Sequence, residues 1–322
     1  MSQYKKINNN IHEIIIDNPK TPSKKLTWIN IANAEKKEIE YLKKNFNFSN
    51  EHLINSFSSK TAQRPTIEIK KDYIFMILHF PIFRDGNIAA GEIDFFIGDG
   101  YLATIHNNKI EALNNFFNTG KKDPNSLMAY GLESSAILLY ELLEKLISYT
   151  YTILDQNSIT IEEVEDMIFA QKQKKSVTEI LVLRRNIINI RKILQNHKNT
   201  IQKLMEMENK LMPEDKIDKH YLSLLEHSKK IWQILDNQKE MIDALYSTNE
   251  SLMNYKISDI MKTLTIFSVI VFPLTLLAAI FGMNTVKGMP FMENENGFWI
   301  IIVIMLIGSF GMLLFFKKKK WL

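Results

Sequence analysis

Two apolar runs lie near the C-terminal end of the chain, at residues 264–281 and 298–316, after a long stretch with the mixed pattern of a water-soluble protein. Runs of about 18 to 20 residues are long enough for a helix to cross a hydrocarbon core of roughly 30 Å. The polar segment Gly282-Met283-Asn284 follows the first run, where such a helix reaches the far side of the bilayer. The pattern predicts membrane helices over 264–284 and 298–316, joined by an external loop over 285–297.

Residues 1–125 have short runs rich in Ile, Tyr and Phe, which are typical of strands. The turn signals Asp85-Gly86 and Gly98-Asp99-Gly100 separate the later runs. Strands are expected over 13–17, 26–32, 67–83, 91–97 and 101–106, and helices over 34–46 and 109–118. We therefore expect an α+β domain over 1–125.

No catalytic constellation is visible in this domain. The sequence lacks a phosphate-binding glycine loop, a serine elbow and a pair of histidines spaced for zinc. His79 lies in an apolar strand and is interpreted as a core or edge residue, while Asp94 and Asp99 are interpreted as turn and solvent residues. An enzyme is the least supported class, and no catalytic residue is proposed.

Residues 126–212 are predicted to form an antiparallel helical hairpin. Its first arm runs through 127–155 and 159–169, and the acids of 159–169 are expected on a solvated face. A polar turn over 171–175 follows, and Ser176-Val177-Thr178-Glu179 has the pattern of a capping box that begins the second arm.

From residue 213 to 281 the only proline after Pro213 is Pro273, and glycine is absent, so one helix is predicted. It would serve as a stalk over 213–263 and continue into the first membrane run, with a length of roughly 100 Å. Apolar residues recur along it at steps of three and four, which predicts a seam that packs on copies of itself or on neighbouring helices. The seam residues are Ile217, Tyr221, Leu224, Ile231, Leu235, Ile242, Leu245 and Leu252, with polar gaps at Ser228, Gln238 and Asn249.

Composition narrows the function classes. The 322 residues include no cysteine, which excludes disulfides and thiolate metal sites. The net charge of +4 comes from basic residues spread among nearly as many acids, so a nucleic-acid partner is not expected. The N-terminal residues lack the apolar core of a signal peptide, and the N-terminal part is expected in the cytoplasm.

Lysines flank the apolar runs in a pattern that predicts the orientation. Lys256 and Lys262 precede the first run, and the tail over 317–322 holds Lys317, Lys318, Lys319 and Lys320. The loop carries Lys287 together with the acids Glu293 and Glu295. The positive-inside rule therefore places both termini in the cytoplasm of a multi-pass protein of the cell membrane.

The first run has a stripe of smaller and more polar residues at steps of three to four, set in an Ile, Leu and Val background. Its members are Ser258, Met261, Thr265, Ser268, Phe272, Thr275, Ala279 and Gly282. Small residues also mediate helix packing in lipid, so the stripe alone does not decide whether this side of the helix packs on another helix or lines a pore. Two helices cannot enclose a water-filled path, so a channel built from this chain must be an oligomer in which each subunit contributes one wall helix.

Phe281-Gly282-Met283-Asn284, the Met289-Pro290 pair in the loop, the second run and the Lys-rich end together resemble the CorA family of divalent-cation channels. The runs 260–266 and 273–275 are similar to the family's pore helix, and Gln63-Arg64-Pro65 is a weaker similarity. The resemblance is dense from about residue 258 onward, and the architecture matches along the whole chain.

The resemblance implies a homopentamer with a funnel-shaped cytoplasmic domain and a pore lined by the first membrane helix. It implies an outer selectivity ring of Gly282, Met283 and Asn284, whose amides bind the water shell of Mg²⁺. The pore would be lined by Ser258, Ser268, Thr275 and Ala279, together with the apolar residues Met261, Leu264 and Phe272. Of these, Met261 and Leu264 would form a constriction that closes the pore by losing water. Lys317 to Lys320 would form a basic ring.

The sequence also departs from the family pattern. Ser258 stands where the family usually has Asn at the inner mouth, Phe291 stands where Glu often follows Met289-Pro290, and Lys287 adds positive charge near the entrance. The acid pair implied to sense Mg²⁺ between subunits is absent. The residues near those positions are Glu51, His52, Ser223, Glu226 and His227.

The leading hypothesis is a passive Mg²⁺ influx channel, driven by the membrane potential and gated by intracellular divalent cations. A transporter of Zn²⁺, Co²⁺ or Ni²⁺ on the same frame, similar to the ZntB branch, is the alternative within transport, because His52 and His227 suit softer metals. Met283 within the filter favours the Mg²⁺ branch. A non-conducting, membrane-anchored coiled-coil scaffold explains the seam and the Lys tail, but not the polar segment Gly282-Met283-Asn284 after the first run.

Overall fold

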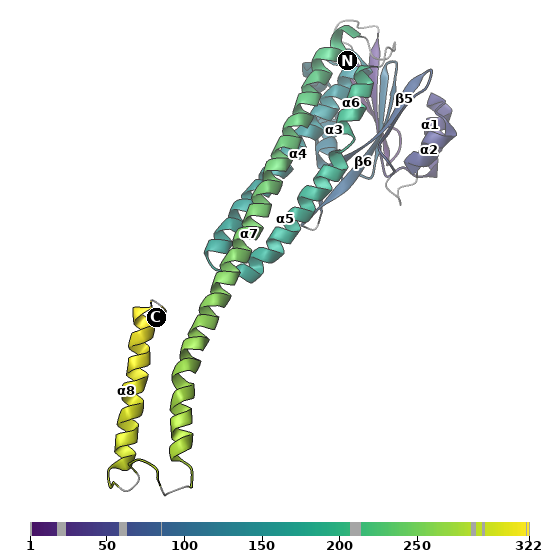
Figure 1. The fold of residues 1–322 in the computed structure, drawn as a ribbon. Coiled ribbons are helices and arrows are strands. Elements are labelled where there is room, and N and C mark those ends of the chain that lie inside the picture. Colours follow the sequence, from purple (N-terminus) through teal and green to yellow (C-terminus); the bar gives the residue numbers. More distant parts are fainter. Residues whose placement is uncertain are drawn as a thin grey trace. The chain divides into compact units, whose positions relative to one another are not determined.

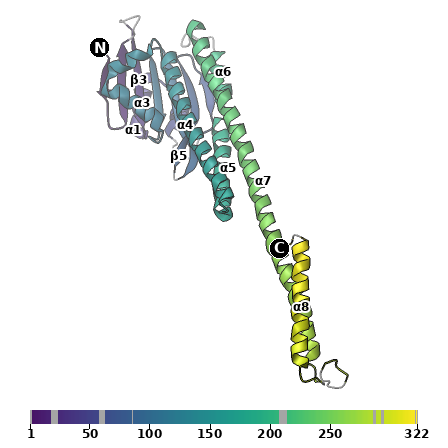
Figure 2. The ribbon, with the colours of Figure 1, turned by 90° about the vertical axis from the view of Figure 1, so that its left-hand side faces the viewer.

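The computed structural model describes residues 2–17, 24–57, 63–84, 86–206, 214–284, 288–291, 294–319 and 321. The chain divides into two compact units, a first unit over residues 1–246 and a second unit over residues 247–322. The first unit holds a sheet covered by helices, and the second unit holds two long helices (Figures 1 and 2).

The sheet of the first unit has seven described strands in the order β1-β2-β3-β7-β6-β5-β4. Every neighbouring pair is antiparallel except β3 and β7, which are parallel. The strands are β1 (Gln3–Lys6), β2 (Ile11–Asp17), β3 (Lys25–Ala32), β4 (Thr66–Ile69), β5 (Tyr73–Arg84), β6 (Asn87–Gly98) and β7 (Tyr101–His106). The α+β architecture expected from the strand pattern is confirmed.

One predicted strand, over residues 67–83, was wrong as a single element. The structure divides it into β4 and β5, which form an antiparallel hairpin with Ile69 opposite Ile74. The polar residues Lys70, Lys71 and Asp72 interrupt the apolar run, and Lys70 N donates to Tyr73 O over 2.9 Å. The short strand β1 and the helix α2 (Asn50–Phe57) were not expected from the sequence.

Helices cover both faces of the sheet (Figure 1). The helices α1 (Lys36–Phe46) and α2 lie on one face, over a core that includes Phe48, Phe75 and Phe96. On the other face, α3 (Glu111–Lys122) brings Phe117 to within 4.9 Å of Trp28, measured between ring centroids. A 3₁₀ helix, η1 (Pro124–Tyr130), follows α3. Because side chains alternate along a strand, each strand supplies both cores.

The predicted helical hairpin is present as α4 (Ser135–Phe169) and α5 (Gln173–Leu194), followed by α6 (His197–Met205), but its first arm begins at Ser135 and not at residue 127 as expected, because residues 124–130 form η1. The capping-box assignment at Ser176 was wrong, because α5 begins three residues earlier, at Gln173, and Ser176 is fully buried. The residues Gln173, Lys174 and Lys175 are good helix formers, so they extend the helix towards the turn. Asp166 and the other acids near the tip are exposed, as expected.

The helix predicted over 213–281 is present as the single helix α7 (Glu214–Phe281) of 68 residues. Within the first unit most of its seam is buried and packs on α4 of the same chain, while Leu245 is half-buried and the side chain of Ile217 lies outside the described residues. Gln238 Nε2 donates to Leu154 O over 2.7 Å and lies 2.9 Å from Ser158 Oγ. The polar position Gln238 is therefore part of the helix contact. The buried seam residues are Tyr221, Leu224, Ser228, Ile231, Leu235, Gln238 and Ile242.

The second unit consists of the last part of α7, a loop and the helix α8 (Gly297–Lys318). Both views show α8 running back alongside the end of α7 (Figures 1 and 2). Both helices are long and apolar enough to cross a membrane.

Candidate ion-conducting site

The part of α7 from Ser258 to Phe281 presents two different sides. At about 100° per residue, the predicted stripe residues fall within an arc of about 120°. Many of these side chains are exposed in the single chain, including Met261 (56%) and Phe272 (71%), and Leu264 of the proposed constriction is exposed as well (57%). Ser258, Thr275 and Ala279 are exposed as well, and Ser268 is half-buried.

The less exposed side of the same segment lies opposite the stripe. Ile266 is buried with 7% exposure, and Ile270, Leu274, Leu277 and Phe281 are half-buried. These residues recur at steps of three and four and are centred about half a turn away from the stripe. Since α8 runs alongside this segment, the covered side can be assigned to the contact between the two helices (Figure 2). The stripe is left without a partner within the described residues of the second unit.

Three of the four hydroxyl groups on the stripe share one hydrogen-bonding arrangement. The hydroxyls of Thr265, Ser268 and Thr275 donate to the carbonyls of Met261, Leu264 and Val271 over 2.8, 2.9 and 2.9 Å. Each hydroxyl hydrogen is therefore used inside the helix, and the oxygen keeps lone pairs that can only accept. Water bound to a cation turns its hydrogens outward, so a wall of acceptors fits a hydrated cation.

The helix α7 ends at Phe281, directly before the polar segment Gly282-Met283-Asn284. Gly282 N donates to Ala278 O over 2.9 Å, and Met283 N donates to Ile280 O over 3.2 Å, so these bonds complete the last turn. A Cβ at Gly282 would lie 3.1 Å from Ala278 O, which leaves little room for a side chain. Met283 and Asn284 are exposed. The Asn284 amide makes no hydrogen bond to another described residue, so it is available to a ligand.

The loop between the helices is partly described. Glu295 is exposed, whereas Glu293 and Lys287 lie outside the described residues. Gly297 N donates to Asn294 O over 2.9 Å, and a Cβ at Gly297 would lie 2.1 Å from Phe291 O. The loop therefore closes tightly on the first residue of α8, and only glycine fits there.

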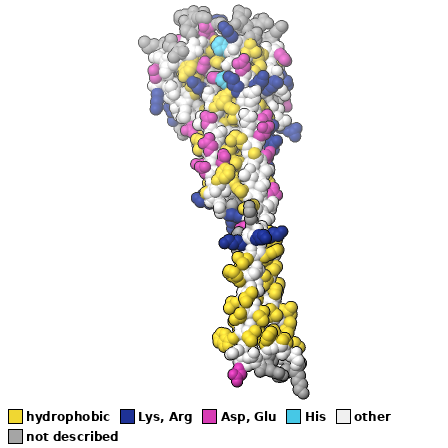
Figure 3. Space-filling view, turned by 60° about the vertical axis from the view of Figure 1, so that its left-hand side comes forward, with side chains coloured by type: hydrophobic (Ala, Val, Ile, Leu, Met, Phe, Trp, Pro, Cys, Tyr) yellow, Lys and Arg dark blue, Asp and Glu magenta, His cyan; other side chains and the backbone are white. Residues whose placement is uncertain are grey.

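Charged and aromatic residues flank the apolar part of the second unit. Lys317, Lys318 and Lys319 are exposed at the end of α8, while Lys320 lies outside the described residues. Figure 3 shows a band of basic side chains at one end of the apolar surface and an acidic side chain at the other. Trp299 and Trp321 are exposed near the two ends of α8, as aromatic residues are at membrane interfaces.

The candidate regulatory residues belong to two separate clusters in the first unit. His52 is fully buried, with Nδ1 at 3.0 Å from the Tyr73 hydroxyl and Nε2 at 3.0 Å from Glu68 Oε2. The His52 hydrogen bond lowers the pKa of Glu68, and Lys70 acts in the same direction. Both ring nitrogens of His52 thus have partners in their own chain, while Glu51 is exposed.

The second cluster joins α4 and α7. His227 Nδ1 lies 3.1 Å from the Tyr151 hydroxyl, and His227 Nε2 lies 3.5 Å from Glu144 Oε1. Glu226 is exposed. Among the described residues, no group of three or more His, Asp or Glu side chains is arranged to hold a metal ion. A single chain therefore does not bring the four predicted regulatory residues together, and their role stays a prediction.

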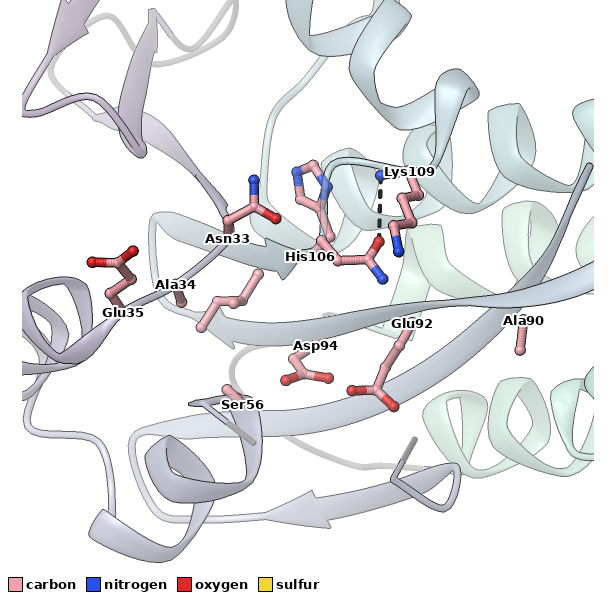
Figure 4. Close-up of a pocket in the computed structure, with 11 residues that line it drawn as sticks. Asn33, Ala34, Glu35, Ser56, Ala90, Glu92, Asp94, His106 and Lys109 are labelled. Atoms are coloured by element: carbon pink, nitrogen blue, oxygen red, sulfur yellow. Dashed lines mark hydrogen bonds between the residues drawn. The ribbon is translucent and has the colours of Figure 1, made fainter. Parts of the chain in front are cut away.

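The interpretation of Asp94 as a turn or solvent residue was wrong. Asp94 lies on β6 with 2% exposure, on the same sheet face as Phe96. The sequence signal was present, because Glu92 and Asp94 alternate with apolar residues and so share one face of a strand (Figure 4). Asp99, by contrast, is exposed at the turn between β6 and β7. His79 is buried, as expected for a core residue.

Comparisons with known proteins agree with this architecture. Residues 23–318 match the family described as CorA-like Mg²⁺ transporter protein. The cobalt/magnesium transport protein CorA of Thermotoga maritima is 23% identical over 299 residues, which cover 92% of this chain and 83% of that protein.

Solved structures share the fold. The complete structure of the CorA magnesium transporter from Methanocaldococcus jannaschii has a TM-score of 0.81 at 22% identity, covering 92% of both chains. The ZntB cytoplasmic domain from Vibrio parahaemolyticus has a TM-score of 0.57 at 14% identity, covering 71% of this chain and 88% of that one. The family match spans nearly the whole chain, both membrane-type helices included, and the chain therefore belongs to the CorA-like family of divalent-cation transporters.

Proposed function

We propose that the protein is a passive Mg²⁺ influx channel, formed by five copies of the chain around a pore that the stripe of α7 lines. The observation that carries this proposal is the stripe itself, a row of acceptor hydroxyls at exposed Thr265 and Thr275 and half-buried Ser268, opposite the side of α7 that is less exposed. The Thermotoga maritima relative is named a cobalt/magnesium transport protein, which supports the same class of ion.

An oligomer is required because the described residues of one chain supply two helices that could cross a membrane, and two helices cannot enclose a water-filled path. With α8 against the covered side of α7, the stripes of neighbouring copies can face a common axis. The apolar outer surface of the second unit would then face lipid. The seam of α7 in the first unit packs on α4 of its own chain, so it does not call for the coiled-coil scaffold that was considered as an alternative.

The residues of the proposed pore suit an ion that keeps its water. Mg²⁺ gives up its hydration shell reluctantly, so oxygen acceptors at the wall can bind the shell without removing it. A ring of Asn284 amides would select such an ion at the mouth with Gly282 and Met283, and Thr275 and Ser258 would provide further stations. Neutral amides would bind more weakly than carboxylates, which allows release.

Met261 and Leu264 would form an apolar constriction that closes by losing water. We place both termini in the cytoplasm and the Asn284 ring outside, in agreement with the lysines around α7 and at the end of α8. An inside-negative potential would then supply on the order of 4–5 kcal/mol per 100 mV for a divalent ion.

The ligand types of the stripe favour Mg²⁺ over Zn²⁺, Co²⁺ or Ni²⁺. The stripe and the exit offer hydroxyl and amide oxygens and no imidazole, and oxygen ligands suit hard ions. The fold similarity to a ZntB domain concerns the cytoplasmic part, so transport of a softer metal is the alternative that the experiment must test.

We also propose that intracellular divalent cations regulate the channel through the first units of neighbouring subunits. Glu51 and Glu226 are exposed and thus accessible to an ion between subunits. His52 would have to release Tyr73 or Glu68 to bind one, so we expect inhibition by cytoplasmic Mg²⁺ to be weak.

The test is ion flux into liposomes that contain the purified protein, compared for Mg²⁺, Co²⁺, Ni²⁺ and Zn²⁺, with and without a pH gradient. We expect Mg²⁺ influx that follows the membrane potential and does not change with the pH gradient. Flux of Zn²⁺ in preference to Mg²⁺, or flux that requires the pH gradient, would contradict the proposal.

A further inference from the structure

Lysines from both helices of the second unit lie at one level, at the end of α8. Lys262 lies about 29 Å before the end of α7, and Lys317 lies about 30 Å after the start of α8, at a rise of about 1.5 Å per residue. Because α8 runs back alongside the end of α7, these two distances place both residues at the same end of the pair (Figures 1 and 2). The lysine cluster, as we call it, consists of Lys262, Lys317, Lys318 and Lys319.

Lys262 belongs to the side of α7 that faces α8. It lies four residues before the buried Ile266, so the two side chains share one face of the helix. Lys262 is half-buried, whereas the three lysines of α8 are exposed. Lysines at the C-terminal end of a helix complement its dipole, which accounts for those of α8. Lys262 lies inside α7, far from either end, and has no such explanation.

The covered side of α8 also ends in a lysine. Its half-buried and buried residues recur at steps of three and four and are Met305, Ser309, Met312 and Phe316. Lys319 follows Phe316 by three residues and therefore continues this side at the end of the helix. The covered sides of α7 and α8 thus bring Lys262 and Lys319 together beyond their last apolar contacts.

The charge of the lysine cluster is not balanced by acids. Within the described part of the chain, no ion pair joins any of its four lysines to a carboxylate. Asp259 lies three residues before Lys262 without pairing with it, and Glu295 lies at the opposite end of α8. Four ammonium groups at one level repel each other, so an anion between them would lower the free energy of this arrangement. Figure 3 shows the band of basic side chains at this end of the apolar surface.

The tail adds an aromatic ring at the same level. Lys319 N donates to Phe315 O over 3.1 Å, and Trp321 N donates to Phe316 O over 3.0 Å, so the chain turns back at the end of α8. The Trp321 ring then stacks on Phe316, with 5.9 Å between the ring centroids and 23° between the ring planes. Trp321 remains 44% exposed. An exposed indole has the polar and apolar parts that suit the headgroup level of a bilayer.

An apolar surface begins directly beside the lysine cluster. On α8, Leu314 and Phe315 have 52% and 59% exposure, and on α7, Phe267 has 68% exposure. A ligand at this place therefore meets positive charge at one end and hydrocarbon-binding surface at the other. A free phosphate ion would use only the charge, whereas an anionic phospholipid would use both parts.

We propose that the lysine cluster binds the phosphate headgroup of an anionic phospholipid, between Lys262 and Lys319, with the Trp321 indole beside the headgroup. The acyl chains of this lipid lie on the exposed apolar side chains of α8. The proposal rests on the membrane placement of α7 and α8 in the proposed function, and it uses no residue of the stripe that faces the pore. In the proposed orientation the lipid belongs to the cytoplasmic leaflet, where basic residues next to membrane helices attract anionic lipids.

The test is native mass spectrometry of the purified full-length protein in detergent, titrated with phosphatidylglycerol or with phosphatidylcholine of the same acyl chains. Both lipids carry a phosphate, but only phosphatidylglycerol has a net negative charge. We expect phosphatidylglycerol to bind at least tenfold more tightly. Lys262→Gln and Lys319→Gln should each weaken its binding about fivefold and leave phosphatidylcholine binding unchanged. Equal affinities of the two lipids for the wild type would overturn the proposal.

Two further variants separate a site from general attraction. Lys262→Arg keeps the charge and should retain most of the affinity for phosphatidylglycerol. Lys230→Gln is the matched control for a lost charge, because Lys230 is exposed on the same helix about 48 Å from Lys262. If Lys230→Gln weakens the binding as much as Lys262→Gln does, the lipid responds to net charge and the site does not exist.

A competition arm distinguishes the two sources of phosphate. Inorganic phosphate at tenfold molar excess over the lipid should leave phosphatidylglycerol bound, because it cannot use the apolar surface. Displacement of the lipid under these conditions would show that the lysine cluster binds a free anion, and the lipid assignment would be wrong.

Thermal unfolding in detergent separates binding from folding. Phosphatidylglycerol should raise the unfolding temperature of the wild type and of Lys262→Arg more than phosphatidylcholine does, because a ligand of the folded state stabilises it. The double variant Lys262→Gln/Lys319→Gln should lose this difference and keep its unfolding temperature without lipid. If the double variant keeps the difference, the lysine cluster does not bind the lipid.

These measurements do not depend on conduction. A protein that prefers phosphatidylglycerol but does not conduct Mg²⁺ would contradict the proposed channel and support the lipid site. A protein that conducts Mg²⁺ without this preference would contradict the lipid site alone.

Discussion

The hydroxyl of Tyr221 donates a hydrogen bond to the main-chain carbonyl of Ala136 over 2.9 Å, which joins the beginning of α7 to the beginning of α4. Tyr221 has 1% exposure and is the first buried seam residue of α7 in the described part of the chain. This contact belongs to the first unit and fixes one end of the longest helix to the helices that cover the sheet.

Tyr221→Phe should lower the free energy of unfolding of the first unit by about 1 kcal/mol, because it removes one buried hydrogen bond and keeps the ring. Tyr221→Ala should cost about 3–5 kcal/mol, since it also leaves a cavity. Thermal unfolding followed by near-ultraviolet circular dichroism measures both. The neighbouring Leu222 has 50% exposure, so Leu222→Ala should have a small effect. Equal effects of Leu222→Ala and Tyr221→Ala would contradict the assigned packing.

The α7 seam illustrates what the sequence could and could not predict. Steps of three and four identified Leu224, Ile231 and Leu235 as one buried face. Periodicity shows that a face is buried but not which surface covers it, so packing on the chain's own α4 could not be separated from packing between copies. The contact of Gln238 with Leu154 O could not be predicted for the same reason. A single Gln in an apolar seam is interpreted as an interruption of the seam, not as a contact.

Short and mixed segments account for the other differences. The helix α2 has only eight residues, and its buried side is carried by His52 and Leu53, so no period was visible. Asp94 was assigned to a turn because the Gly98-Asp99-Gly100 signal lies nearby. The stripe of the candidate pore was easier to recognise from the sequence, because Thr265, Ser268 and Thr275 interrupt a nearly uniform apolar run at helical spacing. The less exposed side of α7, opposite these residues, could be identified only from the structure.

Asn284→Ala should abolish the Mg²⁺-dependent rescue of a bacterial strain that lacks its own Mg²⁺ uptake systems. The variant removes the exposed amide at the proposed mouth, and we expect Mg²⁺ flux into liposomes to fall at least tenfold. Asn296→Ala is the control, since Asn296 lies in the same loop and its side chain makes no cap hydrogen bond to α8. Normal growth with Asn284→Ala would show that Asn284 does not belong to the selectivity ring.

Thr275→Val should slow Mg²⁺ flux several-fold, because valine keeps the shape of threonine and removes the oxygen that accepts from hydrated ions. Thr275→Ser keeps the hydroxyl and should retain most of the flux. Thr263 is a matched control, since its hydroxyl donates to Asp259 O over 3.0 Å in the same manner but lies outside the stripe. If Thr263→Val and Thr275→Val reduce liposome flux equally, the hydroxyl of Thr275 does not contact the ion path.

The buried Asp94 carboxyl predicts an unusual pH dependence of stability. Burial raises its pKa from the ordinary value of 3.8 to about 7, so between these values the folded protein keeps a proton that the unfolded chain releases. Proton uptake on folding makes the free energy of unfolding decrease as the pH rises. The stability that this group contributes is complete below about pH 4 and is lost as the pH rises through about 7.

Asp94→Asn cannot titrate, so the variant should gain stability relative to the wild type as the pH rises from 4 to 8. The full difference is on the order of 4 kcal/mol by linkage. Unfolding of the full-length protein in a chelator-containing buffer at several pH values measures it. The lowered pKa values of His106 and His197 act in the opposite direction, but both residues are present in both proteins and cancel in the comparison. Parallel stability curves for the two proteins would show that Asp94 is ionised throughout this range, and the buried environment assigned to its carboxyl would then be wrong.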